Sequence, residues 1–229
     1  MLATAATLTA LVSVAACSGS SAPTTTPTTA PAPSSTSASP APPEQQLQQL
    51  AALGTKAAFQ ATYSVRQSHP SSRATWQVWR TSTSLRVDVV LKHATATLIV
   101  TPHAAYSCHR PHRTCFTVAK GKQPIPVQLR LLAEELFSSN VTTLATRPAA
   151  FSVTSTSVVP DFGHCFGVAP SSRSQSSGID KAEYCFNDNG LLTRVRYPNG
   201  NLVQLQHSTM HAPKRSVFVP YSSPTPLPK

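Results

Sequence analysis

Acidic side chains are scarce in this sequence of 229 residues. Eight Asp and Glu stand against 19 Lys and Arg, which gives a formal net charge of +11. A catalytic pair of carboxylates would have to come from this small set, and the adjacent Glu134 and Glu135 would point in different directions on a helix. Asp161, Asp180 and Asp188 fall in predicted loops and turns, where aspartate favours the local backbone geometry. The acidic residues therefore show no pattern typical of an enzyme.

Motifs of nucleophilic, metal and phosphate chemistry are also missing. The sequence contains no G-x-S-x-G, no H-E-x-x-H and no phosphate-binding G-x-x-x-x-G-K-[ST]. Its eight histidines are dispersed, and only His109 and His112 lie between two nearby cysteines that could join them as metal ligands. A lone histidine such as His93 or His207 is more typical of the surface. We therefore expect a protein that is not an enzyme and needs neither a cofactor nor a metal.

No hydrophobic run is long enough to remain in a membrane. Residues 1–16 are rich in Leu, Val and Ala, carry no charge and end at Cys17. A bilayer-spanning helix needs about 20 apolar residues, so this run fits the apolar core of a secretory signal peptide. The sequence "VAAC" at 14–17 resembles the lipobox of bacterial lipoproteins, whose cysteine receives a diacylglyceryl group. The resemblance implies anchoring to the outer face of the cell membrane through lipidated Cys17; an ordinary secreted protein is the alternative.

Charge and large apolar side chains are absent from the next segment as well. Residues 18–43 contain seven prolines and thirteen Ser or Thr. Such a segment cannot bury enough apolar surface to offset the entropy of ordering it. We expect a disordered tether over 17–43, one folded domain over 44–220 and a flexible tail over 221–229.

Four cysteines follow in the chain: Cys108, Cys115, Cys165 and Cys185. An even number outside the cytoplasm implies two disulfides, for which three connectivities exist. The first two cysteines flank a proline-containing turn, and the last two lie at either end of a polar loop. The economical choice therefore pairs Cys108 with Cys115 and Cys165 with Cys185. The alternative is a zinc site, in which His109 and His112 would join the first two cysteines.

Alternation of apolar and polar residues predicts a sheet. A short amphipathic helix at 44–58 is expected first. Six strands follow within about sixty residues, at 59–66, 73–81, 84–92, 94–101, 104–109 and 114–120. In the third strand, Leu85 and Leu91 are expected on the apolar face and Asp88 on the opposite one. Further strands are predicted at 151–159, 163–169, 182–207 and 216–220, with "NDNG" and "PNG" as tight turns. The result is a mainly β (α+β) fold of about 10–11 antiparallel strands with two helices.

The helical period returns once, at 124–138. Its broad apolar stripe predicts a helix that covers the open face of the curved sheet. The apolar face of the strands and this helix could enclose a ligand cavity, or could pack shut as an ordinary core. The candidate lining residues are Phe59, Tyr63, Trp76, Val78, Leu85, Val87, Val89, Leu98, Leu132 and Leu136.

The order of these segments resembles the LolA-like fold. The matching parts are "FQATYSV", "TWQVWRTSTSLRVDVV", "ATLIV", "AAYSC" and "GLLTRVRYPNGNL". The resemblance covers about 45–220 and extends to lipoprotein-localisation carriers, actinobacterial LppX/LprG lipoproteins and RseB-type stress sensors. It implies a curved, half-open antiparallel β-barrel with one or two helices over its concave face and a hydrophobic cavity.

The resemblance also implies a function. We expect a cell-envelope lipoprotein that binds a lipid or acylated ligand in an apolar cavity. The alternative is a non-catalytic interaction or stress-sensing module with a closed core and an envelope protein as its partner. The excess of positive charge fits either a solvated surface or an anionic membrane. Nucleic acid is not an expected partner, because the protein is exported and no basic run exceeds two residues.

Overall fold

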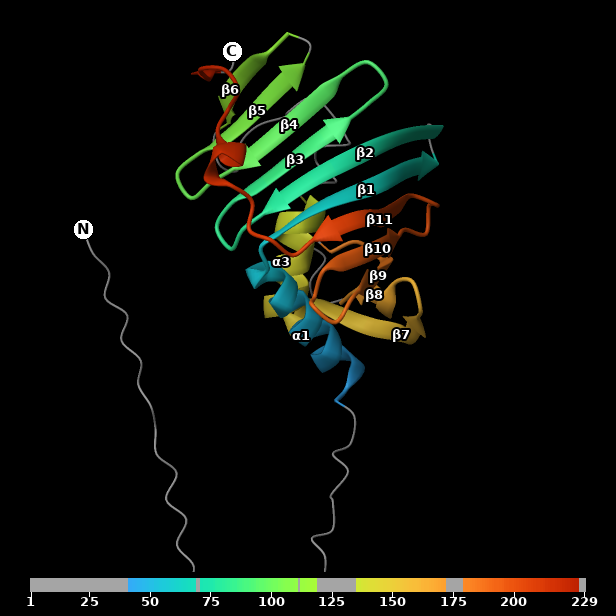
Figure 1. Ribbon diagram of the computed structural model, residues 1–229. Helices are drawn as coiled ribbons and strands as arrows, with labels where there is room; N and C mark the ends of the chain where they lie inside the picture. The colour runs from blue at the N-terminus through green and yellow to red at the C-terminus, as the bar shows by residue number, and fades with distance from the viewer. Residues whose placement is uncertain (1–40, 69–70, 111, 119–134, 172–178, 227–229) are drawn as a thin grey trace, which may run out of the picture. The chain divides into compact units, whose positions relative to one another are not determined.

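One open, curved sheet of twelve strands is the frame of the domain, as the computed structural model shows (Figure 1). The residues that the structure describes are 41–68, 71–110, 112–118, 135–171 and 179–226. The strands are β1 (Phe59–Ser68), β2 (Ser71–Arg80), β3 (Leu85–Val90), β4 (Thr95–Val100), β5 (Ala105–Arg110), β6 (Thr114–Val118), β7 (Phe151–Val159), β8 (Gly163–Pro170), β9 (Ala182–Phe186), β10 (Leu192–Arg196), β11 (Leu202–Thr209) and β12 (Thr225–Pro226). The helical segments are α1 (Pro43–Lys56), the π-helix η1 (Glu135–Asn140), α3 (Val141–Thr146) and the 3₁₀ turns η2 (Pro148–Ala150) and η3 (Arg215–Phe218).

The strands pair in the order β12-β6-β5-β4-β3-β2-β1-β11-β10-β9-β8-β7. All pairings are antiparallel except that of β12 with β6, which is parallel. The two ends of the sheet, β12 and β7, do not pair with each other, so the sheet stays open. The prediction of a mainly β half-open barrel with helices is confirmed, and β12 is the strand beyond the ten or eleven expected.

The apolar face predicted for the first strands is the core face. Tyr63 of β1 is directly opposite Trp76 of β2, and Trp76 is directly opposite Val89 of β3. All three side chains are buried. Residues directly opposite one another in an antiparallel pair share a face, so the row forms one continuous apolar surface.

The helices α1 and α3 complete this core on one side of the sheet (Figure 1). Leu47 of α1 and Leu144 of α3 are fully buried against it. The helical structure predicted at 124–138 continues past its predicted C-terminal end, since the chain is helical from Glu135 through Thr146. Its predicted first part, 124–134, lies outside the described residues.

Two glycines bring α1 close to the turn between β9 and β10. A Cβ atom on Gly54 would lie 2.3 Å from the backbone oxygen of Gly190, which leaves no room for a side chain. Gly190 itself has a φ of +75°, the left-handed conformation that the predicted "NDNG" turn requires. The predicted "PNG" turn is likewise present, with Gly200 at a φ of +84°.

One expectation about β3 is wrong, and another is confirmed. Leu91 lies beyond the end of the strand, in a turn closed by a hydrogen bond from its N–H to the carbonyl of Ala94, and it is exposed. Asp88 lies on the face opposite the core, as expected, and it is buried there, because Arg86 binds its two carboxylate oxygens at 2.8 Å each. The C-terminal segment covers this face, because Arg86 Nη1 also donates to the carbonyl of Val217 at 2.9 Å.

The C-terminal segment differs from the prediction. The strand expected at 216–220 is instead the 3₁₀ turn η3, closed by a hydrogen bond from the Val217 N–H to the carbonyl of Lys214. The segment predicted as a flexible tail is part of the fold as far as Pro226, because Thr225 and Pro226 pair with β6. Tyr221 stacks on the guanidinium of Arg110 at 4.9 Å.

Candidate binding site

Both predicted disulfides are present, and each joins directly opposite residues of two adjacent strands. Cys108 of β5 is bonded to Cys115 of β6, and Cys165 of β8 is bonded to Cys185 of β9. The alternative of a zinc site around Cys108 and Cys115 is therefore wrong for this state of the protein, because zinc binds thiolates and these sulfurs are bonded to each other.

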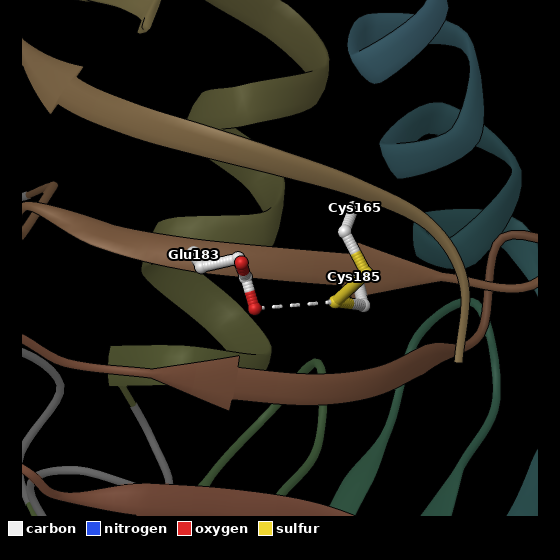
Figure 2. A group of neighbouring side chains, drawn as sticks. All are labelled: Cys165, Glu183 and Cys185. Atoms are coloured by element: carbon white, nitrogen blue, oxygen red, sulfur yellow. Dashed lines mark hydrogen bonds between the residues drawn. A yellow bond between two sulfur atoms is a disulfide. The ribbon is translucent and has the colours of Figure 1, made fainter. Parts of the chain in front are cut away.

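Figure 2 shows a second group with metal-ligand chemistry, in which Glu183 lies beside the disulfide of Cys165 and Cys185. The carboxylate Oε1 is 3.9 Å from the sulfur of Cys185. Glu183 also forms an ion pair with Arg194, whose guanidinium lies 4.2 Å from the ring centroid of Phe162. The group is thus a disulfide next to a paired carboxylate, and it offers no thiolate to a metal.

The predicted cavity-lining residues are gathered in one place and are buried. Nine of the ten lie in the described ranges, and each is at most 6% exposed: Phe59, Tyr63, Trp76, Val78, Leu85, Val87, Val89, Leu98 and Leu136. The tenth, Leu132, lies outside the described residues. Eight of the nine belong to a single packed core, and Leu98 is buried on the same face, directly opposite Val87.

The π-helix η1 covers the concave face above β1 and β2. The ring of Phe137 lies 5.2 Å from that of Tyr63 and 6.2 Å from that of Trp76, centroid to centroid. Tyr63 Oη donates to the carbonyl of Leu192 at 3.0 Å. Complete burial raises the pKa of the Tyr63 hydroxyl far above its usual range, and the nearby positive charge of Arg80 offsets only part of this shift.

Arg80, at the end of β2, holds this helical cover in place. Its Nη1 donates to the carbonyl of Phe137. Burial lowers the pKa of the guanidinium, and none of the carboxylates in the described ranges forms an ion pair with it. The alternation of β2 gave no sign that this residue contacts η1, because the contact depends on where the helical segment returns to the sheet.

Two polar atoms in this region are buried without a hydrogen-bond partner. They are Nε1 of Trp76 and Oδ1 of Asn140, while Nδ2 of Asn140 donates to Tyr184 Oη at 3.4 Å. Buried polar groups are nearly always satisfied, so each such atom calls for an explanation. Apolar ligand sites commonly contain a few polar groups of this kind, which orient the ligand.

Comparisons with known proteins show the fold and nothing finer. No protein-family model and no curated protein matches the chain. Among solved structures, an uncharacterized conserved protein from Thermus thermophilus superposes with a TM-score of 0.51 at 9% identity, covering 76% of this chain and 91% of that one. MucB superposes at 0.47 with 15% identity, covering 77% and 62%, and a LolA superfamily protein from Nitrosomonas europaea at 0.36 with 8% identity, covering 78% and 98%. The fold is LolA-like.

The LolA-like domain is extracytoplasmic, because its two disulfides require an oxidising compartment. None of the helices in the described ranges is both long and apolar enough to cross a membrane. The concave side of the sheet, where the helical cover meets the row from Tyr63 to Val89, is the candidate binding site.

Proposed function

We propose that this protein binds a lipid or acylated ligand on the concave side of its LolA-like half-barrel, without catalysing a reaction. The observation that carries the proposal is the continuous apolar face of β1 to β3 beneath a helical segment, where Trp76, whose Nε1 has no hydrogen-bond partner, lies against Phe137. An acyl chain would take the place of Phe137 against Tyr63 and Trp76. Each methylene group of the acyl chain that is buried contributes about 0.8 kcal/mol to binding, so a long chain contributes this amount many times over.

The anchor belongs to the same proposal. Acylation of Cys17 would hold the protein at the outer face of the cell membrane, and the Ser/Thr/Pro-rich tether would let the domain reach beyond the headgroups. One acyl chain gives only marginal binding, so stable anchoring requires a second or third chain.

Native mass spectrometry of the detergent-free domain tests the proposal. Residues 40–229 form a compact unit of their own and contain the whole core. We expect adducts of lipid mass that extract into chloroform. Phe137→Ala should increase the lipid load because it widens the concave site, whereas Phe166→Ala removes an equally buried ring elsewhere in the core and should leave the load unchanged. A mass without adducts after incubation with envelope lipids would contradict lipid binding.

A second candidate function rests on the edge strand β7. Its nine residues contain no charge and no proline, and in the sheet of the described residues it has a neighbour only on the side of β8. Val158 on this strand is 73% exposed. Natural sheets usually protect their edges with charges or prolines, so an edge of this kind suits the addition of an extended strand from a partner protein. Val158→Lys should abolish such pairing and leave the lipid load unchanged.

A further inference from the structure

Three antiparallel hairpins, β1–β2, β3–β4 and β5–β6, have their connected ends along one margin of the sheet. The strands β1, β3 and β5 end at this margin, which is at the upper right of the sheet in Figure 1. The residues of this margin include five exposed cations, which we call the basic margin: Arg66, Arg73, Lys92, Arg110 and Arg113. Between Phe59 and Val118 the only carboxylate is that of Asp88, which is buried and paired with Arg86.

Two of these cations face each other directly. Arg66 of β1 is the antiparallel partner of Arg73 of β2. Like charges in directly opposite positions destabilise a sheet, and neither residue forms an ion pair with a carboxylate in the part of the chain that the structure describes. An external anion bound here would remove that repulsion.

The facing arginines also line a hollow. A pocket of about 560 Å³ is bounded by Arg66, Arg73 and Lys92 together with the polar side chains of Ser64 and Thr75. None of the described residues that line this pocket carries a carboxylate. Hydroxyl groups and guanidinium N–H groups are donors that suit phosphate oxygens.

The width of the basic margin decides between a small anion and an extended surface. Arg66 lies on β1 and Arg113 precedes β6, so the cations extend over six adjacent strands, about 24 Å at about 4.8 Å per strand. A single phosphate group could neutralise only the facing pair of arginines. Leu91 adds an apolar side chain, 37% exposed, directly before Lys92.

We propose that the basic margin docks the domain on an anionic lipid surface, with the phosphate headgroups held by its cations and Leu91 entering the headgroup layer. Each cation near such a surface strengthens binding about fivefold, and an apolar side chain adds to this in the interfacial layer. The contact lies on the outer margin of the sheet and is independent of the concave site and of the acyl anchor.

Vesicle sedimentation of the full chain tests this inference. Cys17→Ser is included throughout so that no acyl chain contributes. We expect stronger binding to phosphatidylcholine vesicles containing one quarter phosphatidylglycerol than to pure phosphatidylcholine, and a steep loss in high salt. The triple variant Arg66→Gln, Arg73→Gln and Lys92→Gln should weaken binding to the anionic vesicles on the order of a hundredfold.

The matched control removes the same charge elsewhere. Lys56→Gln, Arg147→Gln and Lys214→Gln alter three exposed cations away from the basic margin and should change vesicle binding little. An equal loss in both triple variants would overturn the proposal, because net charge alone would then explain binding. Equal binding to both kinds of vesicle would overturn it as well, as would binding to soluble polyglutamate without any binding to vesicles.

Two single variants separate docking from folding. Arg73→Glu replaces a repulsive pair with an attractive one, so it should raise the melting temperature and still lower binding to anionic vesicles. Leu91→Ser should weaken that binding several-fold, whereas Leu53→Ser, at an exposed position of α1, should not. A fall in melting temperature for Arg73→Glu would show that the facing arginines serve the fold itself.

Discussion

Single residues of the core carry polar groups whose environment is set by distant parts of the chain. The hydroxyl of Tyr63 reaches a carbonyl of Leu192, 129 positions later in the sequence. The guanidinium of Arg80 reaches the carbonyl of Phe137. These contacts fix the position of the helical cover relative to β1 and β2, and they make the stability of the domain depend on pH.

Tyr63 should make the domain sensitive to alkali. The pKa of its hydroxyl is raised by burial, so the folded protein keeps a proton that the unfolded chain releases at about pH 10. The stabilisation is fully present below that pH and is lost as pH rises further. At pH 8, Tyr63→Phe should lower the free energy of unfolding by about 1 kcal/mol, because the hydrogen bond is lost. As pH rises above about 10, the variant should lose less stability than the wild-type protein, because it has no hydroxyl to titrate at this position.

Urea unfolding of residues 40–229 between pH 8 and pH 11 measures this difference. The fragment contains no cysteine outside the two disulfides, which removes thiol exchange as a complication. Above about pH 10 the folded wild-type protein holds one proton more than its unfolded chain, which lowers its free energy of unfolding by about 1.4 kcal/mol per pH unit. We therefore expect the curves of the two proteins to converge near about pH 11. Parallel curves would contradict the assignment to Tyr63.

At the scale of elements, α1 is held against the turn between β9 and β10 by close backbone contact. In an exposed helix, Gly54→Ala would stabilise by about 1 kcal/mol. Here the new Cβ would lie 2.3 Å from the backbone oxygen of Gly190, and we expect destabilisation of about 1–3 kcal/mol in urea. Leu53→Ala, at a half-exposed position next to it, should change stability by less than about 0.5 kcal/mol. A more stable Gly54→Ala protein would show that α1 can move away from the turn.

The two disulfides join neighbouring strands and should differ in their effect on stability. They close loops with sequence separations of 7 and 20 residues. Loop-closure entropy predicts about 2 kcal/mol for the pair Cys108 and Cys115 and about 3 kcal/mol for Cys165 and Cys185. The corresponding double Cys→Ser variants, compared by urea unfolding, should rank in this order. The reverse order would mean that local packing around the sulfurs outweighs chain entropy.

For the whole molecule, the C-terminal segment determines which edge of the sheet is protected. It crosses the outer face of β3, where Arg86 binds it, and ends by pairing with β6 (Figure 1). One edge of the sheet is therefore covered by the chain itself. At the other edge, β7 is left with its uncharged residues toward solvent.

Truncation after Pro220 should test this role. This truncation removes β12, which uncovers the edge of β6, and it removes Tyr221, the aromatic partner of Arg110. We expect a lower melting temperature and concentration-dependent self-association in light scattering, because an uncovered strand edge can pair with another chain. Truncation after Pro226 leaves β12 in place and should behave like the intact protein. A monomeric protein of unchanged stability after the shorter truncation would contradict the role of β12.

Local patterns were sufficient to predict the strands. Period-two alternation placed β1 to β6 and β7 to β11 within a few residues, because side chains of half-buried strands must alternate between core and solvent. The hairpin turns at Gly190 and Gly200 followed from residues that accept positive φ. The cysteine pairings followed from the places of the cysteines on either side of a turn and at either end of a polar loop. The apolar residues of the concave face were also predicted together, since large apolar side chains on one face of a sheet share the core.

Tertiary structure alone decided the remaining features, because each depends on segments that are distant in sequence. Asp88 is buried only because η3 and Arg86 cover it from outside, and Leu91 is exposed because β3 ends one residue before it. The contact of Arg80 with Phe137 requires the helical segment to return over β2. The sequence by itself thus determined the strands, turns and disulfides of this LolA-like domain. The covering of the sheet, and with it the concave site and the basic margin, arose only when distant segments packed together.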